Sequence, residues 1–110
     1  MEEYKFNDFD VCTNPTEIVI YKNGRNHAII EYAVYNDKFF YGIHLDTDNG
    51  GWGFLPNLRS IGYYTLDDCL NAAKQELSEK SKKNIKSGFD VETHKAIVNK
   101  LQQDNQLTLF

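Results

Sequence analysis

The sequence predicts an α+β fold: an antiparallel meander sheet of three or four strands, one main helix packed on its apolar face and a second helix toward the C-terminal end. Runs rich in β-branched and aromatic residues come first, separated by turn dipeptides. Two segments with apolar residues at helical spacing follow them. Strands gathered before helices favour an α+β arrangement over a parallel sheet. The 110 residues suit one domain, which we place at 1–103, followed by a tail at 104–110.

The predicted strands are marked by the turns between them. Asn23-Gly24 ends the first run, and Asn-Gly is the dipeptide that best tolerates the positive φ angles of a two-residue hairpin turn. Asn36-Asp37 separates the second run from the third. We therefore predict a three-stranded meander with strands at 17–22, 28–35 and 38–46.

Alternation with period two divides this sheet into two faces. With two-residue turns, the cross-strand pairs include Ile18 with Ile29, and Tyr32 with Tyr41. One face is continuously apolar and is predicted to be the core face; it comprises Val19, Tyr21, Ala28, Ile30, Tyr32, Val34, Phe39, Tyr41, Ile43 and Leu45. The other face is mixed and suits partial exposure to solvent; it comprises Ile18, Ile20, His27, Ile29, Glu31, Ala33, Tyr35, Lys38, Phe40, Gly42 and His44.

Residues 47–59 are rich in Gly and Asn and predict a long structured loop, with a short fourth strand at 60–64. The loop begins like a calcium-binding loop, because carboxylates alternate at its start. However, Gly50 stands where an oxygen ligand is needed, and Asn57 stands where a bidentate Glu should end the loop. The sequence therefore predicts an ordinary turn here, with no metal and no cofactor.

The main helix is predicted from the residues that follow Thr65. Thr65 and the acidic Asp68 three residues later resemble a capping box, and apolar residues then recur at helical spacing. The helix should therefore begin near Leu66. Its end is open between two positions, Ser81 and a Gly88 cap reached through Ile85.

A second helix is predicted to begin after Asp90, whose side chain is a suitable N-cap. Four of its residues share one face: Val91, His94, Val98 and Leu101. This helix is expected to pack beside the main helix or to project the tail.

Composition and charge exclude several classes of protein. The formal net charge of −4 and pI near 5.3 disfavour general attraction to nucleic-acid backbones. An apolar stretch of about 18 residues is absent from the sequence, and Glu2 and Glu3 stand where a signal peptide would be basic. Cys12 and Cys69 show no spacing typical of metal or redox sites. We therefore expect a cytoplasmic protein with two reduced thiols.

Two sets of side chains are candidates for chemistry or binding. His27, His44 and Glu31 fall on the mixed face, where a His–Glu pair is able to transfer protons. The pattern places no Ser or Cys nucleophile beside either histidine, so we predict no catalytic residues and no enzyme. A possible interaction face is formed by Tyr35, Phe40, His44, Trp52 and Phe54. Stacking of single-stranded nucleic acid on these aromatic rings is the alternative function.

The C-terminal residues Gln106-Leu107-Thr108-Leu109-Phe110 end on two apolar side chains after a polar spacer, and large apolar side chains that a fold leaves exposed usually mark a binding site. They resemble the motif Gln-Leu-x-Leu-Phe with which bacterial replication and repair proteins dock on the DNA sliding clamp. The resemblance implies that Gln106 makes a polar contact, that Leu109 and Phe110 enter an apolar pocket of the clamp, and that Leu107 packs at its rim. The alternative is that this segment forms a short strand or folds onto the core.

These observations together predict a function in protein interaction. The strands, the Gly-Gly-Trp-Gly segment and the helix after Thr65 also loosely resemble small uncharacterised proteins of phages and mobile elements. We expect a non-enzymatic accessory or inhibitor protein of a bacterium, phage or mobile element. Its predicted partners are the sliding clamp, through the tail, and an unidentified second protein, through the globular domain, with no membrane contact.

Overall fold

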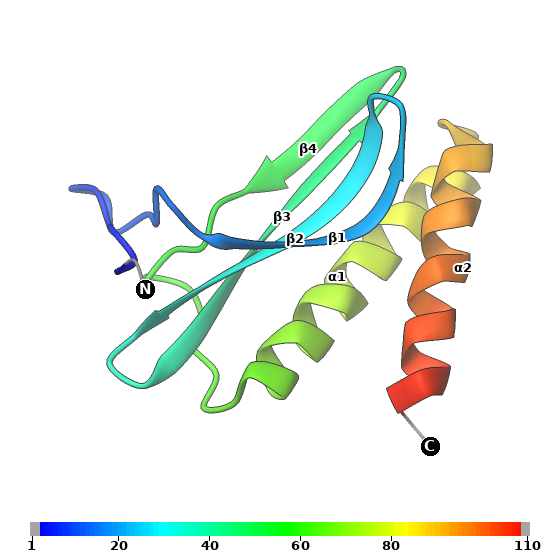
Figure 1. Ribbon diagram of the computed structural model, residues 1–110. Helices are drawn as coiled ribbons and strands as arrows, with labels where there is room; N and C mark the ends of the chain where they lie inside the picture. Colours follow the sequence, from blue (N-terminus) through cyan, green and yellow to red (C-terminus); the bar gives the residue numbers. More distant parts are fainter. Residues whose placement is uncertain (1–2, 109–110) are drawn as a thin grey trace.

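The computed structural model describes residues 3–108, with side chains described as far as Gln103. Four strands form one sheet, and two helices lie side by side against one of its faces (Figure 1). Among the described residues, no helix is both long and apolar enough to cross a membrane. The elements are β1 (Thr16–Asn23), β2 (Asn26–Tyr35), β3 (Lys38–Thr47), β4 (Gly50–Phe54), α1 (Leu66–Lys86) and α2 (Val91–Thr108).

The sheet is an antiparallel meander with the strand order β1-β2-β3-β4, which confirms the predicted fold class. Tyr32 pairs with Tyr41, as the turn at Asn36-Asp37 predicts. Both turn residues have positive φ angles, 50° and 62°, which is the signature of a type I′ hairpin turn. This turn fixes which side chains of β2 and β3 share a face.

The predicted register of β1 is wrong. Asn23 pairs with Asn26, so the turn residues are Gly24 and Arg25, and Gly24 carries the positive φ of 62°. A bulge between Val19 and Tyr21 then shifts the strand by one residue, so that Ile18 faces Ile30 instead of Ile29.

The bulge also changes which side chains of β1 reach the core. Ile18 and Ile20, which were expected on the mixed face, pack against the core cluster. Val19 was expected in the core and is instead 57% exposed. One extra residue in the strand is sufficient for this exchange, because side chains alternate between the two faces.

The fourth strand lies within the segment that was predicted to be a loop. β4 begins directly after the turn at Asp48-Asn49 and pairs with β3. Gly53 allows this close pairing, because a Cβ atom there would lie 2.5 Å from the carbonyl oxygen of Ile43. The expected strand at 60–64 is reduced to one bridge, in which Phe39 and Tyr63 exchange two backbone hydrogen bonds of 2.7 and 2.8 Å.

Helix α1 begins at the predicted residue. The side chain of Thr65 accepts a hydrogen bond of 3.1 Å from the backbone N–H of Asp68, which confirms the N-cap. The helix continues through the lysine-rich stretch to Lys86, and Gly88 follows with a φ of 75°. The longer of the two predicted ends is therefore correct.

The hydrophobic core lies between the sheet and the two helices. Helix α1 contributes Ala73 and Leu77, and α2 contributes Ile97 and Leu101. The strands contribute Ile20, Ala28, Ile30, Ile43 and Leu45. The prediction that the main helix covers the apolar face of the sheet is confirmed, with α2 packed beside α1.

The opposite face of the sheet is also covered, although partial exposure was expected. The N-terminal segment pairs with the chain after β4, where the backbone N–H of Cys12 donates to the carbonyl oxygen of Pro56 at 2.8 Å. Three residues of the predicted mixed face, Glu31, Ala33 and Phe40, are buried on this side. The sheet is therefore a middle layer, with helices on one face and irregular chain on the other.

Candidate functional site

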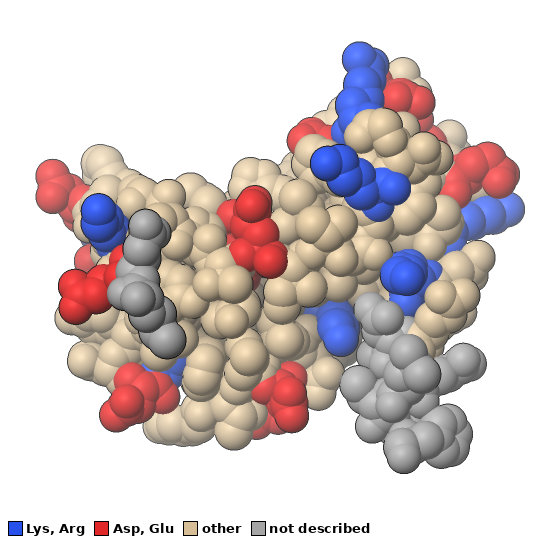
Figure 2. Space-filling view, in the orientation of Figure 1, with Lys and Arg blue, Asp and Glu red and all other residues tan. Residues whose placement is uncertain are grey.

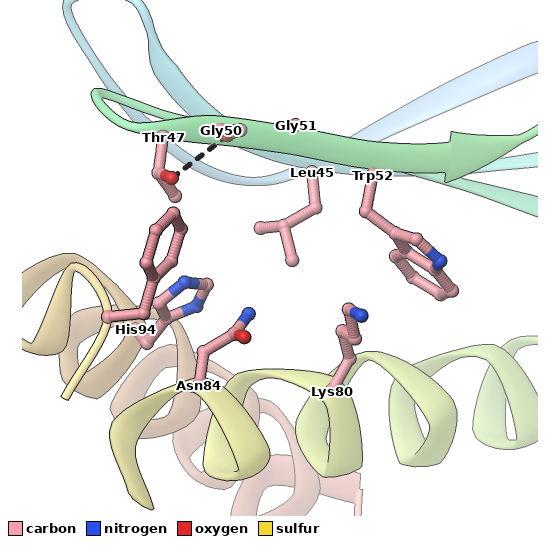
Figure 3. Close-up of a pocket in the computed structure, with 9 residues that line it drawn as sticks. Leu45, Thr47, Gly50, Gly51, Trp52, Lys80, Asn84 and His94 are labelled. Atoms are coloured by element: carbon pink, nitrogen blue, oxygen red, sulfur yellow. Dashed lines mark hydrogen bonds between the residues drawn. The ribbon is translucent and has the colours of Figure 1, made fainter. Parts of the chain in front are cut away.

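A cavity of about 200 Å³ lies between the β3–β4 hairpin and the junction of α1 with α2. We call it the hairpin cavity. Side chains from the strands point toward it from one side, and side chains from the helices point toward it from the other (Figure 3). It is lined by Leu45, Thr47, Gly50, Gly51, Trp52, Lys80, Asn84, Phe89 and His94.

Asp90 connects the two sides of the hairpin cavity. Its Oδ2 lies 2.5 Å from the hydroxyl of Thr47, and its Oδ1 accepts a hydrogen bond of 2.6 Å from the side-chain amide of Asn49. The backbone N–H of Asn49 donates to Oδ2 as well, at 3.2 Å. The hydrogen bond from Thr47 has the largest effect on the pKa of the Asp90 carboxyl, and together with those from Asn49 it lowers this pKa.

Helix α2 begins directly after Asp90, as predicted, and the carbonyl oxygen of Asp90 accepts a hydrogen bond of 3.1 Å from the backbone N–H of His94. The predicted capping role of the Asp90 side chain is wrong, because its hydrogen bonds go to the β3–β4 hairpin. Its φ of 47° lies in the left-handed region, whereas an N-cap residue normally has an extended backbone. Its carboxylate is turned away from the first turn of α2 and toward the hairpin, where it meets Thr47 and Asn49. Asp90 therefore precedes the first residue of α2 and also connects this helix to the turn of the β3–β4 hairpin.

His94 lies at the base of the hairpin cavity and is 1% exposed. Its Nδ1 is 3.2 Å from the hydroxyl of the buried Ser81 on α1. Its Nε2 is buried and has no hydrogen-bond partner among the described residues. Burial lowers the pKa of His94, and the nearby Lys80 lowers it further while Asp90 raises it, so the ring is neutral at neutral pH. An unpartnered ring nitrogen in such a place is costly unless something binds to it.

Lys80 and Trp52 form another side of the hairpin cavity. The ammonium of Lys80 lies 5.1 Å from the centre of the Trp52 ring, which is within the range of a cation–π interaction. Figure 3 shows this ammonium and the amide of Asn84 pointing toward the strands from α1. Among the described residues, the lining contains one lysine and no carboxylate. The arrangement thus combines a polar base with aromatic and aliphatic walls.

The sequence analysis named two of the main residues of this cavity, but not as a group: Trp52 as part of the predicted interaction face, and His94 as part of the shared face of the second helix. It did not single out Lys80. Only the pairing of β4 with β3 brings the three together. The signal that was available is the turn at Asp48-Asn49, which permits a hairpin.

The structure does not bring the predicted interaction face together on one surface. Phe40 is buried, and His44 lies on the same side of the sheet in contact with Glu31. Trp52 and Phe54 pack against the core on the helix side and contact each other edge to face. Tyr35 is exposed and packs against Phe6. On the surface seen in Figure 2, Lys and Arg side chains are scattered among acidic and uncharged ones.

The two histidines of the strands contact different carboxylates. The Nε2 of His44 lies 3.0 Å from Oε1 of Glu31, without the geometry of a hydrogen bond, and His27 lies 3.1 Å from Asp46. Glu31 is 4% exposed, and this burial raises the pKa of its carboxyl, while His44 opposes the rise. The three residues of the proposed His–Glu arrangement are thus divided between two pairs.

Replacement of Glu31 by glutamine is expected to stabilise the fold at about pH 7, by on the order of 1 kcal/mol, because it removes a desolvated charge without changing the shape of the side chain. A raised pKa in the folded state means that the ionised carboxylate destabilises the fold above that pKa. The difference should therefore vanish at about pH 3, below the pKa of about 4.3 of an unfolded-state glutamate, where the carboxyl is protonated in both states. Urea unfolding at the two pH values measures it.

The matched control is Glu79→Gln on the exposed surface of α1, which should change stability little at either pH. A Glu31→Gln variant that is less stable than the natural chain at about pH 7 would show that the pair with His44 outweighs desolvation.

Both thiols are buried and free. Burial raises the pKa of the Cys12 thiol, and raises that of Cys69 to about 11, so neither is a ready nucleophile at neutral pH.

Most of the predicted clamp-binding peptide lies outside the residues whose side chains the structure describes. Leu109 and Phe110 lie outside the described residues, as do the side chains of Gln106 and Leu107.

Comparisons with family models, curated proteins and solved structures found no match to this chain.

Proposed function

We propose that this chain is a non-enzymatic accessory or inhibitor protein of a bacterium, phage or mobile element that acts in the cytoplasm. One segment docks on the DNA sliding clamp, and the globular domain binds a second protein. The observation that carries the proposal is the order of four side chains near the C-terminal end: Gln106, Leu107, Leu109 and Phe110.

The position of this segment relative to the packed part of α2 supports the proposal. Leu101 is the last buried side chain among those described, and Gln102 and Gln103 are exposed. The motif therefore follows the portion of α2 that contributes to the core. Two apolar anchors such as Leu109 and Phe110 each supply about 1.5–3 kcal/mol when a partner buries them. Part of this gain is lost in ordering the peptide, so a weak to moderate affinity results.

The segment before α1 is the best candidate for contact with the second protein. Ile61 is 73% exposed and Tyr64 is 79% exposed, which makes them the most exposed large apolar side chains of the described chain. A second cavity, of about 290 Å³, lies beside them and is lined by Tyr41, Phe54, Ser60, Ile61, Tyr63 and Glu76. Exposed aromatic and aliphatic side chains next to a hollow are typical anchors of protein interfaces.

Removal of the clamp-binding segment is expected to abolish binding to a purified bacterial sliding clamp. A chain ending at Asn105 should give no heat of binding by isothermal titration calorimetry. The double substitution of Leu109 and Phe110 by alanine should weaken binding at least tenfold, because tenfold corresponds to about 1.4 kcal/mol and each anchor contributes at least that much. Gln103 is exposed and precedes the motif, so Gln103→Ala should leave the affinity for the clamp unchanged.

The surface around Ile61 provides the second control. Substitution of Ile61 and Tyr64 by serine should leave the affinity for the clamp unchanged. The second protein should copurify with the natural chain and should not copurify with this variant. Absence of clamp binding by the full chain would refute the docking proposal. A second protein retained by the serine variant would refute the assignment of this surface.

A further inference from the structure

The side chains that line the hairpin cavity favour the binding of an anion. Lys80 supplies the only charge among the described residues that line it, and the carboxylate of Asp90, which joins the hairpin to α2, already accepts hydrogen bonds from Thr47 and Asn49. Asn84 adds a side-chain amide that is able to donate hydrogen bonds. A ligand that carries a negative charge would find a cation and donors here without facing a lining carboxylate.

The unpartnered Nε2 of His94 indicates the same kind of ligand. When the hydroxyl of Ser81 donates to Nδ1, a neutral ring carries its proton on Nε2. That N–H is then a buried donor without an acceptor in the described chain. Buried donors are rarely left unpaired in folded proteins, so an acceptor supplied by a ligand accounts for this one.

The size and the walls of the hairpin cavity restrict the rest of the ligand. A volume of about 200 Å³ is somewhat larger than the roughly 150 Å³ that accepts a benzene molecule. Leu45, Trp52 and Phe89 provide apolar surface, and two of the three are aromatic. Such walls favour a flat, apolar body of about one ring.

We propose that the hairpin cavity binds a small carboxylate with a flat apolar body, of the size of a monocyclic aromatic acid. The carboxylate is received by Lys80, Asn84 and the Nε2 of His94, and the ring packs against Trp52. This inference is independent of clamp docking, because the cavity is built from residues 45–94 and the motif begins at Gln106.

The test uses benzoate as the probe and the full chain as the protein. Trp52 is the only tryptophan of the chain and lines the cavity, so its fluorescence reports occupancy directly. Benzoate should change the emission of Trp52 in a saturable manner and should shift the ring nitrogen signals of His94 in NMR spectra. Benzamide has the same shape without the charge and should bind at least fivefold more weakly.

Variants of two lysines on α1 separate specific binding from a general attraction of anions. Lys80→Met removes the charge from the cavity and should weaken the affinity for benzoate at least fivefold. The affinity is taken from the midpoint of the titration, because loss of the cation–π contact with Trp52 also changes the intensity of the fluorescence. Lys83→Met removes an exposed charge from the same helix and should leave the midpoint unchanged. Thermal unfolding of each variant verifies that it is folded.

Three results would overturn the proposal. The first is the absence of saturable binding of benzoate to the natural chain. The second is equal binding of benzoate by the natural chain and Lys80→Met, and the third is equal binding of benzoate and benzamide by the natural chain. Loss of the C-terminal motif should not affect any of these titrations, so failure here is distinguishable from failure of clamp docking.

Discussion

Replacement of Gly42 by valine is expected to lower the free energy of unfolding by about 3 kcal/mol, the upper end of the usual cost of overpacking. A Cβ atom at this position would collide with the carbonyl oxygen of Phe54 and would lie 2.8 Å from both the carbonyl carbon of Leu55 and Cδ of Pro56. These neighbours are backbone or proline ring atoms, which are unable to rotate away. The clash is relieved only if the chain after β4 lifts from the sheet. Urea unfolding measures the loss.

The control for Gly42 is another glycine of the same sheet. At Gly50 the nearest atoms to an added Cβ belong to the ring of Phe89, at 3.2 and 3.4 Å, and that side chain is free to shift. Gly50→Ala should therefore change stability by less than about 1 kcal/mol, since it also reduces the entropy of the unfolded chain. Equal stability of Gly42→Val and Gly50→Ala would contradict the tight crossing of the chain over the sheet.

Turn chemistry explains why one hairpin was predicted correctly and the other was not. Asn36 and Asp37 both accept positive φ, so their turn has one natural placement. At the first hairpin, Gly24 fits the second position of a turn at Asn23-Gly24 and also the first position of a turn at Gly24-Arg25. The structure has the turn at Gly24-Arg25. The bulge that follows depends on packing against the helices, which local sequence does not encode.

The missed strand has a different physical origin. Glycines are unfavourable in strands in general, so a segment with Gly50, Gly51 and Gly53 indicates a loop. In the structure the lack of side chains at Gly51 and Gly53 is what permits contact with Asp46 and with the backbone of Ile43. Close approach between segments is a tertiary property, and it reverses the local preference.

The candidate site shows the same limit. Helical spacing placed His94 on the buried face of the second helix, and this is correct. Spacing alone does not reveal that one ring nitrogen reaches Ser81 while the other has no partner. The hydrogen bonds from Thr47 and Asn49 to Asp90 span more than 40 residues of sequence, so the cavity they enclose follows from the tertiary structure.

Leu77→Ala is expected to lower the free energy of unfolding by about 3 kcal/mol, within the range found when a buried leucine is truncated. Leu77 is fully buried at the centre of α1, in the cluster that also contains Ile43, Ile97 and Leu101. Contacts from three elements prevent the core from collapsing into the space that the substitution leaves, so most of the cavity should persist. Alanine has the higher helix propensity, so any loss reflects packing and not the helix itself.

Leu70→Ala is the matched control, because it makes the same chemical change on the same helix at a position that is only partly buried against the core. Its cost should be about half that of Leu77→Ala, since less apolar surface is removed from contact and water reaches the space. Urea unfolding of both variants with equal m-values would make the comparison direct. If both substitutions cost the same small amount, the sheet and the two helices do not share the single core described for this fold, and the position of the hairpin cavity between them would lose its structural basis.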